Sequence, residues 1–279
     1  TNAMVEEYML LANIWTAKKC LEAYPRCAML RRHPPPLEKK FGSLVQMAGS
    51  YGLEIKTATS KELGDSLDAA TMEGDPYFNK LMRILATRCM QQAEYFSSGT
   101  LAPSEYNHYG LSIPIYTHFT SPIRRYADVL VHRLLAASLG LEQLPDKLMD
   151  PQAMRKVAQG INHRHRMAQF AGRSSTELHA LIYFKDKGTV VAEGRVTKLR
   201  HNGFMVLIPQ YGLESVVHLT PKAADGAAAK AEFTLSEDSL TLTCNSDAAR
   251  SYRVLQTVTV SIRIEETTGF RRKLCLRIA

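Results

Sequence analysis

Two adjacent arginines, Arg124 and Arg125, follow a Ser-Pro pair at the predicted start of a helix. Ser121 is a favourable N-cap residue, and Pro122 suits the first helical position because the amide that proline lacks would be unpaired there. The helix macrodipole disfavours cations in the first turn by up to about 1 kcal/mol and favours anions. Free amides and two guanidinium groups therefore predict a phosphate receptor. The alternative is a pair of solvated arginines, or Arg124 held by Asp128 one turn later.

Apolar residues recur at helical spacing after the arginines and predict one buried stripe, made of Ile123, Tyr126, Ala127, Leu130, Val131 and Leu134. Tyr116 and Tyr126 are candidates for stacking on aromatic bases, but the position of Tyr126 on the stripe favours the core. Asp128 is expected to orient one of the two arginines rather than to bind a metal ion.

The composition favours a globular protein with a polyanionic partner. Apolar residues make up 45% of the chain and charged residues 22%, with a net charge of +8. The five cysteines are scattered and form no C-x-x-C pair, which argues for a reducing compartment and against a disulfide scaffold or a zinc cluster. His163 and His165 are two residues apart, a spacing that disfavours shared metal ligation on a helix. The sequence contains no run of about 18 apolar residues, the length that would predict a membrane-spanning helix.

The first two thirds of the chain read as mainly helical. We expect helices near residues 4–21, 37–50, 60–70, 76–96, 122–139 and 151–184, with an interruption of the last one near Gly160 as an alternative. The abrupt start of the first helix suggests that the chain begins inside a larger domain. Its predicted apolar face consists of Met4, Tyr8, Leu11, Ala12, Ile14, Trp15, Ala17 and Leu21. Residues 30–36 read as a basic linker that ends in three prolines, and residues 108–111 as a short extended piece.

Near residues 185–188 the pattern changes from helical periodicity to alternation, which places a domain boundary there. About five strands follow, at 195–199, 204–208, 213–218, 258–264 and 274–278. A small closed barrel of the OB type is the simplest fold for them. Residues 221–251 are rich in Ala, Ser and Asp and read as an inserted loop, with room for a short hairpin. The fold class is therefore α+β, largely helical and then a five-stranded barrel.

Several motifs carry a family resemblance. The segment from Tyr116 to Arg133, YTHFTSPIRRYADVLVHR, resembles the signature of the RNB domain of ribonuclease II family exoribonucleases. Residues 4–13, 28–34, 83–90 and 108–111 are similar to the eukaryotic branch, which supplies the catalytic subunit of the RNA exosome. Residues 194–219 are similar to an S1 RNA-binding barrel. By this resemblance, residues 1–186 form the C-terminal portion of an RNB domain and residues 187–279 an S1-type OB-fold domain.

The resemblance implies processive hydrolysis of single-stranded RNA from the 3′ end to nucleoside monophosphates, with Mg²⁺ as the cofactor. In the family, Mg²⁺ is held by clustered aspartates in the N-terminal part of the RNB domain. The aspartates of this chain are scattered, so no metal ligand is predicted within it. We therefore expect the chain to be the C-terminal part of a longer enzyme and to be inactive by itself.

The resemblance assigns the catalytic role to Arg124 and a neighbouring phosphate contact to Arg125. His118, Thr120 and Ser121 would shape the same pocket. Further residues are candidates for binding RNA or phosphate: Tyr116, Arg166 and Arg173 in the helical part, and Arg195, Lys198, Arg200, Phe204 and His218 in the barrel. Phe204 could equally be a core side chain that fills the barrel. The basic residues on the helix predicted at 151–184 could equally form a solvated face.

The resemblance implies single-stranded RNA and other exosome subunits as partners. No membrane partner is expected. The implied location is the nucleus and nucleolus, with the cytoplasm as an alternative. A rival hypothesis is a noncatalytic RNA-binding or scaffold protein that keeps a degenerate RNB domain.

Overall fold

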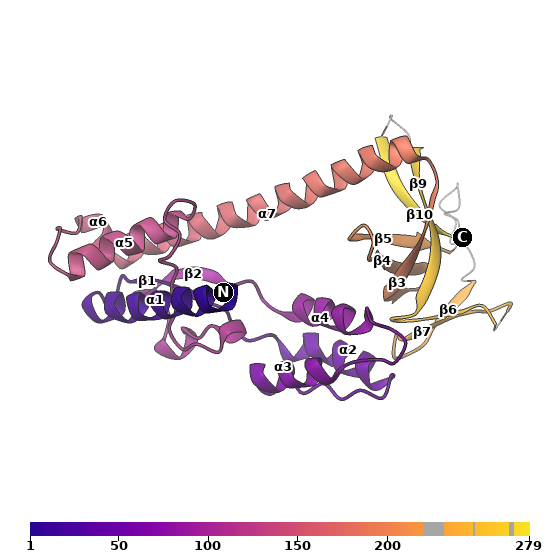
Figure 1. The fold of residues 1–279 in the computed structure, drawn as a ribbon, viewed down its shortest axis with the longest axis horizontal. Helices are drawn as coiled ribbons and strands as arrows, with labels where there is room; N and C mark the ends of the chain where they lie inside the picture. Colours follow the sequence, from indigo (N-terminus) through magenta and orange to yellow (C-terminus); the bar gives the residue numbers. More distant parts are fainter. Residues whose placement is uncertain (220–231, 248, 268–270) are drawn as a thin grey trace. The chain divides into compact units, whose positions relative to one another are not determined.

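The computed structural model describes residues 1–219, 232–247, 249–267 and 271–279 (Figure 1). These residues form two compact units. The first comprises residues 1–41, 56–66 and 86–171, and the second comprises residues 42–55, 67–85 and 172–279. These units are defined by compactness, and each combines segments that are distant in the sequence. They do not test the domain boundary predicted near residue 187, which stays a prediction.

The core of the first unit lies between α1 (Asn2–Ala23), α5 (Tyr126–Ser138) and a two-stranded sheet. β1 (Met29–Arg32) pairs antiparallel with β2 (Glu94–Ser97), in a register that sets Leu30 opposite Phe96. Buried side chains from all four elements meet in one cluster, which includes Cys20, Leu30, Phe96 and Leu134. This core supports the loop that carries the two arginines.

The first helix is confirmed, but its predicted apolar face is only partly buried. Ala17 is buried as predicted, whereas Tyr8 and Trp15 are 65% and 60% exposed. The buried side also carries Asn13, Thr16 and Cys20, which the predicted face did not include. Ala17 and Cys20 let the α1 backbone approach α5, and the Sγ atom of Cys20 lies 4.0 Å from the carbonyl oxygen of Val131. Close packing at small side chains therefore outweighs the apolar stripe.

The predicted helix over 76–96 is too long. The helix α4 covers Phe78–Cys89, and residues from Glu94 onward form β2. Tyr95 and Phe96 pair with Arg31 and Leu30, more than sixty positions away in the chain. The same pairing shows that the basic linker reading of residues 30–36 is wrong for its first part, because Met29–Arg32 is a strand.

The remaining helical predictions are largely confirmed. α2 covers Glu38–Gly49 and α3 covers Ser60–Ala69, and the Thr59 Oγ1 atom accepts a hydrogen bond of 3.1 Å from the amide of Glu62. A short α6 (Asp146–Met149) precedes α7 (Pro151–Lys187), which passes Gly160 without a break. Three 3₁₀ turns cover Ser98–Thr100, Pro103–Glu105 and Tyr109–Leu111, so the extended piece expected at residues 108–111 is wrong apart from a bridge at His108.

The second unit contains the predicted five-stranded barrel (Figure 1). Its strands are β3 (Val190–Arg200), β4 (Gly203–Ile208), β5 (Leu213–His218), β9 (Thr257–Thr267) and β10 (Arg271–Ile278). They close in the order β10-β5-β4-β3-β9, in which β10 and β5 are parallel and the other pairs are antiparallel. Alternate residues such as Val196, Val206 and Val260 are fully buried. The α+β class with an OB-like barrel is confirmed.

The insertion between β5 and β9 has its own small sheet. β6 (Phe233–Leu235), β7 (Thr241–Cys244) and β8 (Ser251–Arg253) pair antiparallel in that order. The sequence allowed for a hairpin here, and the structure adds a third strand. Residues 220–231 and 248 of the insertion lie outside the described residues.

Candidate functional site

The arginine segment forms a turn before its helix begins. α5 starts at Tyr126, with Arg125 at the N-cap position, and Pro122–Arg124 form a turn. The amides of Arg124 and Arg125 donate to the carbonyl oxygen of Ser121 at 3.2 and 3.1 Å. The expected N-cap at Ser121 and first helical position at Pro122 are therefore wrong by four residues.

A buried carboxylate explains the later start. The side chain of Asp128, in the first turn of α5, is fully buried. Its Oδ1 atom accepts hydrogen bonds from the Ser121 amide at 2.8 Å and from Arg125 Nη2 at 2.7 Å, and its Oδ2 atom accepts one from Arg125 Nε at 2.9 Å. The macrodipole also favours an anion at this end of the helix. Asp128 thus orients Arg125, as the sequence analysis allowed.

The shifted helix start changes which apolar side chains are buried. Ala127, Leu130, Val131 and Leu134 are buried as predicted, but Ile123 is 96% and Tyr126 is 63% exposed. Ile123 lies in the turn rather than on the helix, so helical spacing does not apply to it. The expectation that Tyr126 belongs to the core is therefore wrong, and its ring is available for stacking.

The loop from Tyr116 to Thr120 is fixed by hydrogen bonds to three elements. From α1, the buried Asn13 donates to the Tyr116 hydroxyl at 3.0 Å and accepts from the Phe119 amide at 2.8 Å. From β1, the Met29 carbonyl accepts from Thr117 Oγ1 at 2.7 Å. From α5, the Nε2 atom of His132 lies 2.9 Å from the carbonyl oxygen of Phe119, and the two rings stack with 4.2 Å between their centroids. The arginine turn therefore extends from a rigid support.

A cavity of about 670 Å³ adjoins this loop within the first unit. Side chains from α1, β1 and the loop line it, including Glu6, Asn13, Arg31, His108, Tyr116, His118, Thr120 and Arg125. The sequence analysis placed four of these residues at the site, namely Tyr116, His118, Thr120 and Arg125. It missed Arg31, although the apolar run Ala28–Leu30 directly before it is typical of a strand.

The histidines of this cavity are neutral at physiological pH. Burial, followed by the charges of Arg31 and Arg125, lowers the pKa of His118 to about 3. Burial, followed by His33 and Arg31, lowers the pKa of His108 to about 4. The Nδ1 atom of His118 lies 2.6 Å from the hydroxyl of Tyr95. The positive charge of the cavity is therefore carried by its arginines.

The other predicted residues of the segment have different surroundings. Arg124 is exposed, and its side chain makes no hydrogen bond or ion pair with another described residue. It lies close enough to His118 to contribute to the lowered pKa of that ring. The Tyr116 ring is only 5% exposed and lies between the rings of His108 and His118, so it offers too little surface for a base to stack on.

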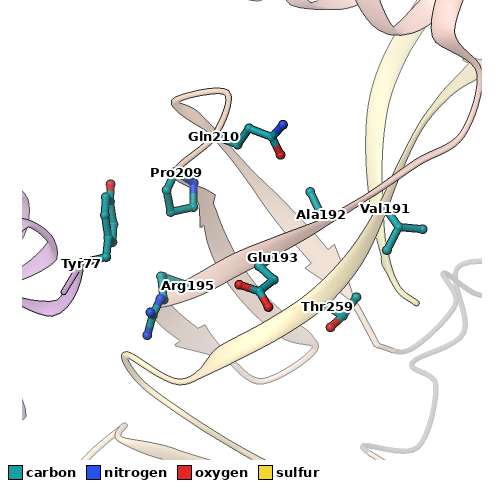
Figure 2. Close-up of a pocket in the computed structure, with 8 residues that line it drawn as sticks. All are labelled: Tyr77, Val191, Ala192, Glu193, Arg195, Pro209, Gln210 and Thr259. Atoms are coloured by element: carbon teal, nitrogen blue, oxygen red, sulfur yellow. The ribbon is translucent and has the colours of Figure 1, made fainter. Parts of the chain in front are cut away.

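In the second unit, the predicted RNA contact Arg195 is already paired. Its Nη1 and Nη2 atoms donate to the two carboxylate oxygens of Asp75 at 2.5 and 2.7 Å, and both side chains are mostly buried. Figure 2 shows Arg195 at a cavity of about 530 Å³ that is also lined by Tyr77, Glu193 and Gln210. Because Asp75 neutralises the guanidinium, Arg195 is a weak candidate for binding phosphate.

Phe204 is fully buried and cannot stack on a base in this structure. Its ring lies 4.7 Å from that of Tyr252 in the insertion, measured between centroids. The sequence left open whether Phe204 stacks on RNA or packs inside the barrel, and the structure favours packing inside the barrel. Lys198, Arg200 and His218 are exposed, as are Arg166 and Arg173 on α7, so their predicted contacts with RNA stay predictions.

The described residues contain no group of three or more His, Cys, Asp or Glu side chains arranged to hold a metal ion. At the arginine cavity, the carboxylate of Asp128 is already engaged by Arg125 and the Ser121 amide. None of the described helices is long and apolar enough to cross a membrane.

Comparison with protein families decides the assignment of the helical part. Residues 1–140, which include the arginine loop and the cavity, match the RNB domain, and residues 190–275 match an S1 domain. The chain belongs to the RNB family. Membership of the RNB nuclease family implies a divalent metal cofactor. The described residues do not provide a site for such an ion, because they contain no cluster of metal ligands.

RNB-family relatives are similar over most of this chain. It is 51% identical to the exosome complex exonuclease RRP44 homolog A of Arabidopsis thaliana over 277 residues, which cover 99% of the chain and 29% of that relative. It is 51% identical to the exosome complex exonuclease RRP44 of Homo sapiens over 222 residues, which cover 80% of the chain and 23% of that relative. The chain thus spans less than a third of the length of these curated relatives.

Two solved structures share the fold of this chain. RNase R of Mycoplasma genitalium, in complex with ribose methylated single-stranded RNA, superposes with a TM-score of 0.79 at 22% identity, covering 100% of this chain and 42% of that one. Yeast Ssd1, described as a pseudonuclease, gives a TM-score of 0.77 at 20% identity, covering 98% and 44%. At these identities the likeness concerns the fold alone.

Proposed function

We propose that the protein carrying this chain is a hydrolytic 3′-to-5′ exoribonuclease that degrades single-stranded RNA processively to nucleoside monophosphates. The observation that carries the proposal is the RNB match over residues 1–140, which contains the arginine turn and its cavity. The names of the similar proteins, exosome complex exonucleases, support the same activity. The net charge of +8 suits a polyanionic substrate.

In this proposal, Arg124 stabilises negative charge that develops on the scissile phosphate. Its guanidinium has no protein partner among the described residues and is exposed on the turn, so it is available to a ligand. Arg124 lies near enough to His118, which lines the cavity, to contribute to the lowered pKa of that ring, so a ligand at the cavity is within its electrostatic reach. Arg125, held by Asp128, contacts a neighbouring phosphate from inside the cavity.

Mg²⁺ is the proposed cofactor, held by carboxylates that the described residues do not supply. Ions held by such carboxylates would supply activation of the attacking water and neutralisation of charge on the phosphate. The residues described here bind and orient the RNA. Residues 1–279 alone are thus expected to bind single-stranded RNA in a salt-sensitive way without digesting it.

The activity is tested with the intact protein and a 5′-labelled single-stranded RNA in Mg²⁺. We expect full-length RNA to be converted to a short 5′-labelled end product with few intermediates, as processive shortening from the 3′ end requires, with release of nucleoside monophosphates. Internal cleavage, or shortening from the 5′ end, would contradict the proposal. The same reaction with residues 1–279 alone should leave the RNA intact.

The rival function is a noncatalytic RNA-binding or scaffold protein. It is supported by the fold shared with a yeast pseudonuclease, which indicates that this architecture does not require activity. Strong binding of RNA by the intact protein without any product in Mg²⁺ would favour this rival.

The exosome is the proposed assembly, and the nucleus and nucleolus are the proposed location. The names of the similar proteins, exosome complex exonucleases, support the assembly. Co-purification of the tagged intact protein with exosome subunits tests the first proposal, and imaging of the tagged protein in cells tests the second.

A further inference from the structure

Arg31 is a cation in the cavity that has no carboxylate partner within the part of the chain that the structure describes. It lies on β1, and its side chain lines the cavity beside Arg125. Its Cζ atom lies 4.7 Å from the ring centroid of Tyr95, and it forms no ion pair with an acidic group among the described residues. Burial lowers the pKa of Arg31, which reflects the cost of removing a guanidinium from water.

The next residue on the strand provides the contrast. Arg32 is paired twice, with Glu94 at 2.7 Å and with Glu105 at 3.2 Å. Successive residues of a strand point to opposite faces, so Arg31 and Arg32 have separate surroundings although they are neighbours in the sequence. One arginine is thus fully compensated by the protein, whereas the other is not.

The charges around Arg31 favour an anionic ligand. Arg125 is close enough to repel it, and Asp128 is engaged by Arg125 and the Ser121 amide. His108 and His118 are neutral and supply no counter-charge. Glu6 is the one acidic residue among those lining the cavity, and it is exposed on α1 without an ion pair to Arg31. The charge of the Arg31 guanidinium is therefore not balanced by any acidic side chain among the described residues.

We propose that Arg31 binds a phosphate of the RNA backbone inside the cavity, next to the phosphate that Arg125 contacts. A guanidinium can donate two parallel hydrogen bonds to the non-bridging oxygens of one phosphate. The ring of Tyr95 orients the guanidinium from one side. This inference rests on the proposed function, because it takes single-stranded RNA as the ligand.

The test measures how salt affects the binding of a single-stranded oligouridine to the intact protein in EDTA, so that no RNA is hydrolysed. Each phosphate contact on a single strand contributes about 0.7 to the slope of log K against log salt. Arg31→Gln should lower the magnitude of the slope by about 0.7 and weaken binding about tenfold at low salt. The matched control Arg32→Gln should leave the slope unchanged, because Arg32 is occupied by two glutamates.

An unchanged slope in folded Arg31→Gln, alongside salt-sensitive binding by the wild type, would overturn this inference and leave the proposed function standing. Absence of RNA binding by the wild type would overturn both. If Arg31→Gln does not fold, Arg31→Lys is measured instead. Lysine keeps the charge but cannot donate the paired hydrogen bonds, so we expect an unchanged slope with several-fold weaker binding. Wild-type affinity in Arg31→Lys would contradict the proposal.

Discussion

Arg125 and Asp128 form a two-point ion pair across the first turn of α5, with 2.9 Å from Nε to Oδ2 and 2.7 Å from Nη2 to Oδ1. The carboxylate side chain is fully buried and the arginine side chain is 20% exposed. The same carboxylate accepts the amide of Ser121. One side chain thus fixes both the arginine and the turn before the helix.

Asp128→Asn should lower the free energy of unfolding by about 3 kcal/mol, because it leaves a largely buried guanidinium without its counter-charge. Urea unfolding of the intact protein measures the effect. The control is Glu22→Gln, which removes an exposed pair of the same i,i+3 spacing, with Lys19, and should cost less than about 0.5 kcal/mol. A loss below about 1 kcal/mol in Asp128→Asn would show that the pair contributes little.

Stability should fall as the pH drops below about 6.5, the ordinary pKa of histidine. His108 and His118 have folded-state pKa values of about 4 and about 3, so between those values and 6.5 the unfolded chain binds more protons than the folded one. In that range, each histidine lowers the free energy of unfolding by up to about 1.4 kcal/mol for each unit by which the pH falls. Above pH 7, neither histidine makes the stability depend on pH. Urea unfolding from pH 8 to pH 4 measures the profile. His118→Asn should have a shallower profile than the wild type, and an identical profile would place the His118 pKa near its ordinary value.

Phe204→Ala should lower the free energy of unfolding of the barrel by about 3 to 4 kcal/mol, because it empties a fully buried site beside Tyr252. RNA affinity, measured on the fraction that remains folded, should stay within about twofold. Phe204→Leu is the matched control, since it keeps most of the volume and should recover most of the stability. Weaker RNA binding with unchanged stability would instead make Phe204 a stacking residue.

The sequence predicted the elements whose signals are local. The helix of α1, the Thr59 cap of α3 and the alternating strands of the barrel follow from periodicity within a dozen residues. The arginine pair was found because Ser-Pro-Ile-Arg-Arg is itself a local motif. The family resemblance then supplied the role of Arg124, which exposure and hydrogen bonds alone do not assign.

The errors arose where distant contacts decide. Residues Glu94–Ser97 form a strand because Met29–Arg32 provides the partner, and no local pattern shows that pairing. Tyr126 is exposed because Asp128 fixes the start of α5 four residues later than Ser121 suggested. Arg31 reads as part of a basic surface run until β1 and β2 place it beside Tyr95 in the cavity.

The central claim is that Arg124 contacts the scissile phosphate, and its most direct test is the turnover of Arg124→Ala in the intact protein with single-stranded RNA and Mg²⁺. We expect turnover to fall by about 100-fold or more, with the RNA dissociation constant in EDTA changed by less than about threefold, because the contact acts mainly on the developing charge. Arg133→Ala, which removes an exposed arginine of α5 rather than of the turn, should leave both values unchanged. Wild-type turnover in Arg124→Ala would contradict the account.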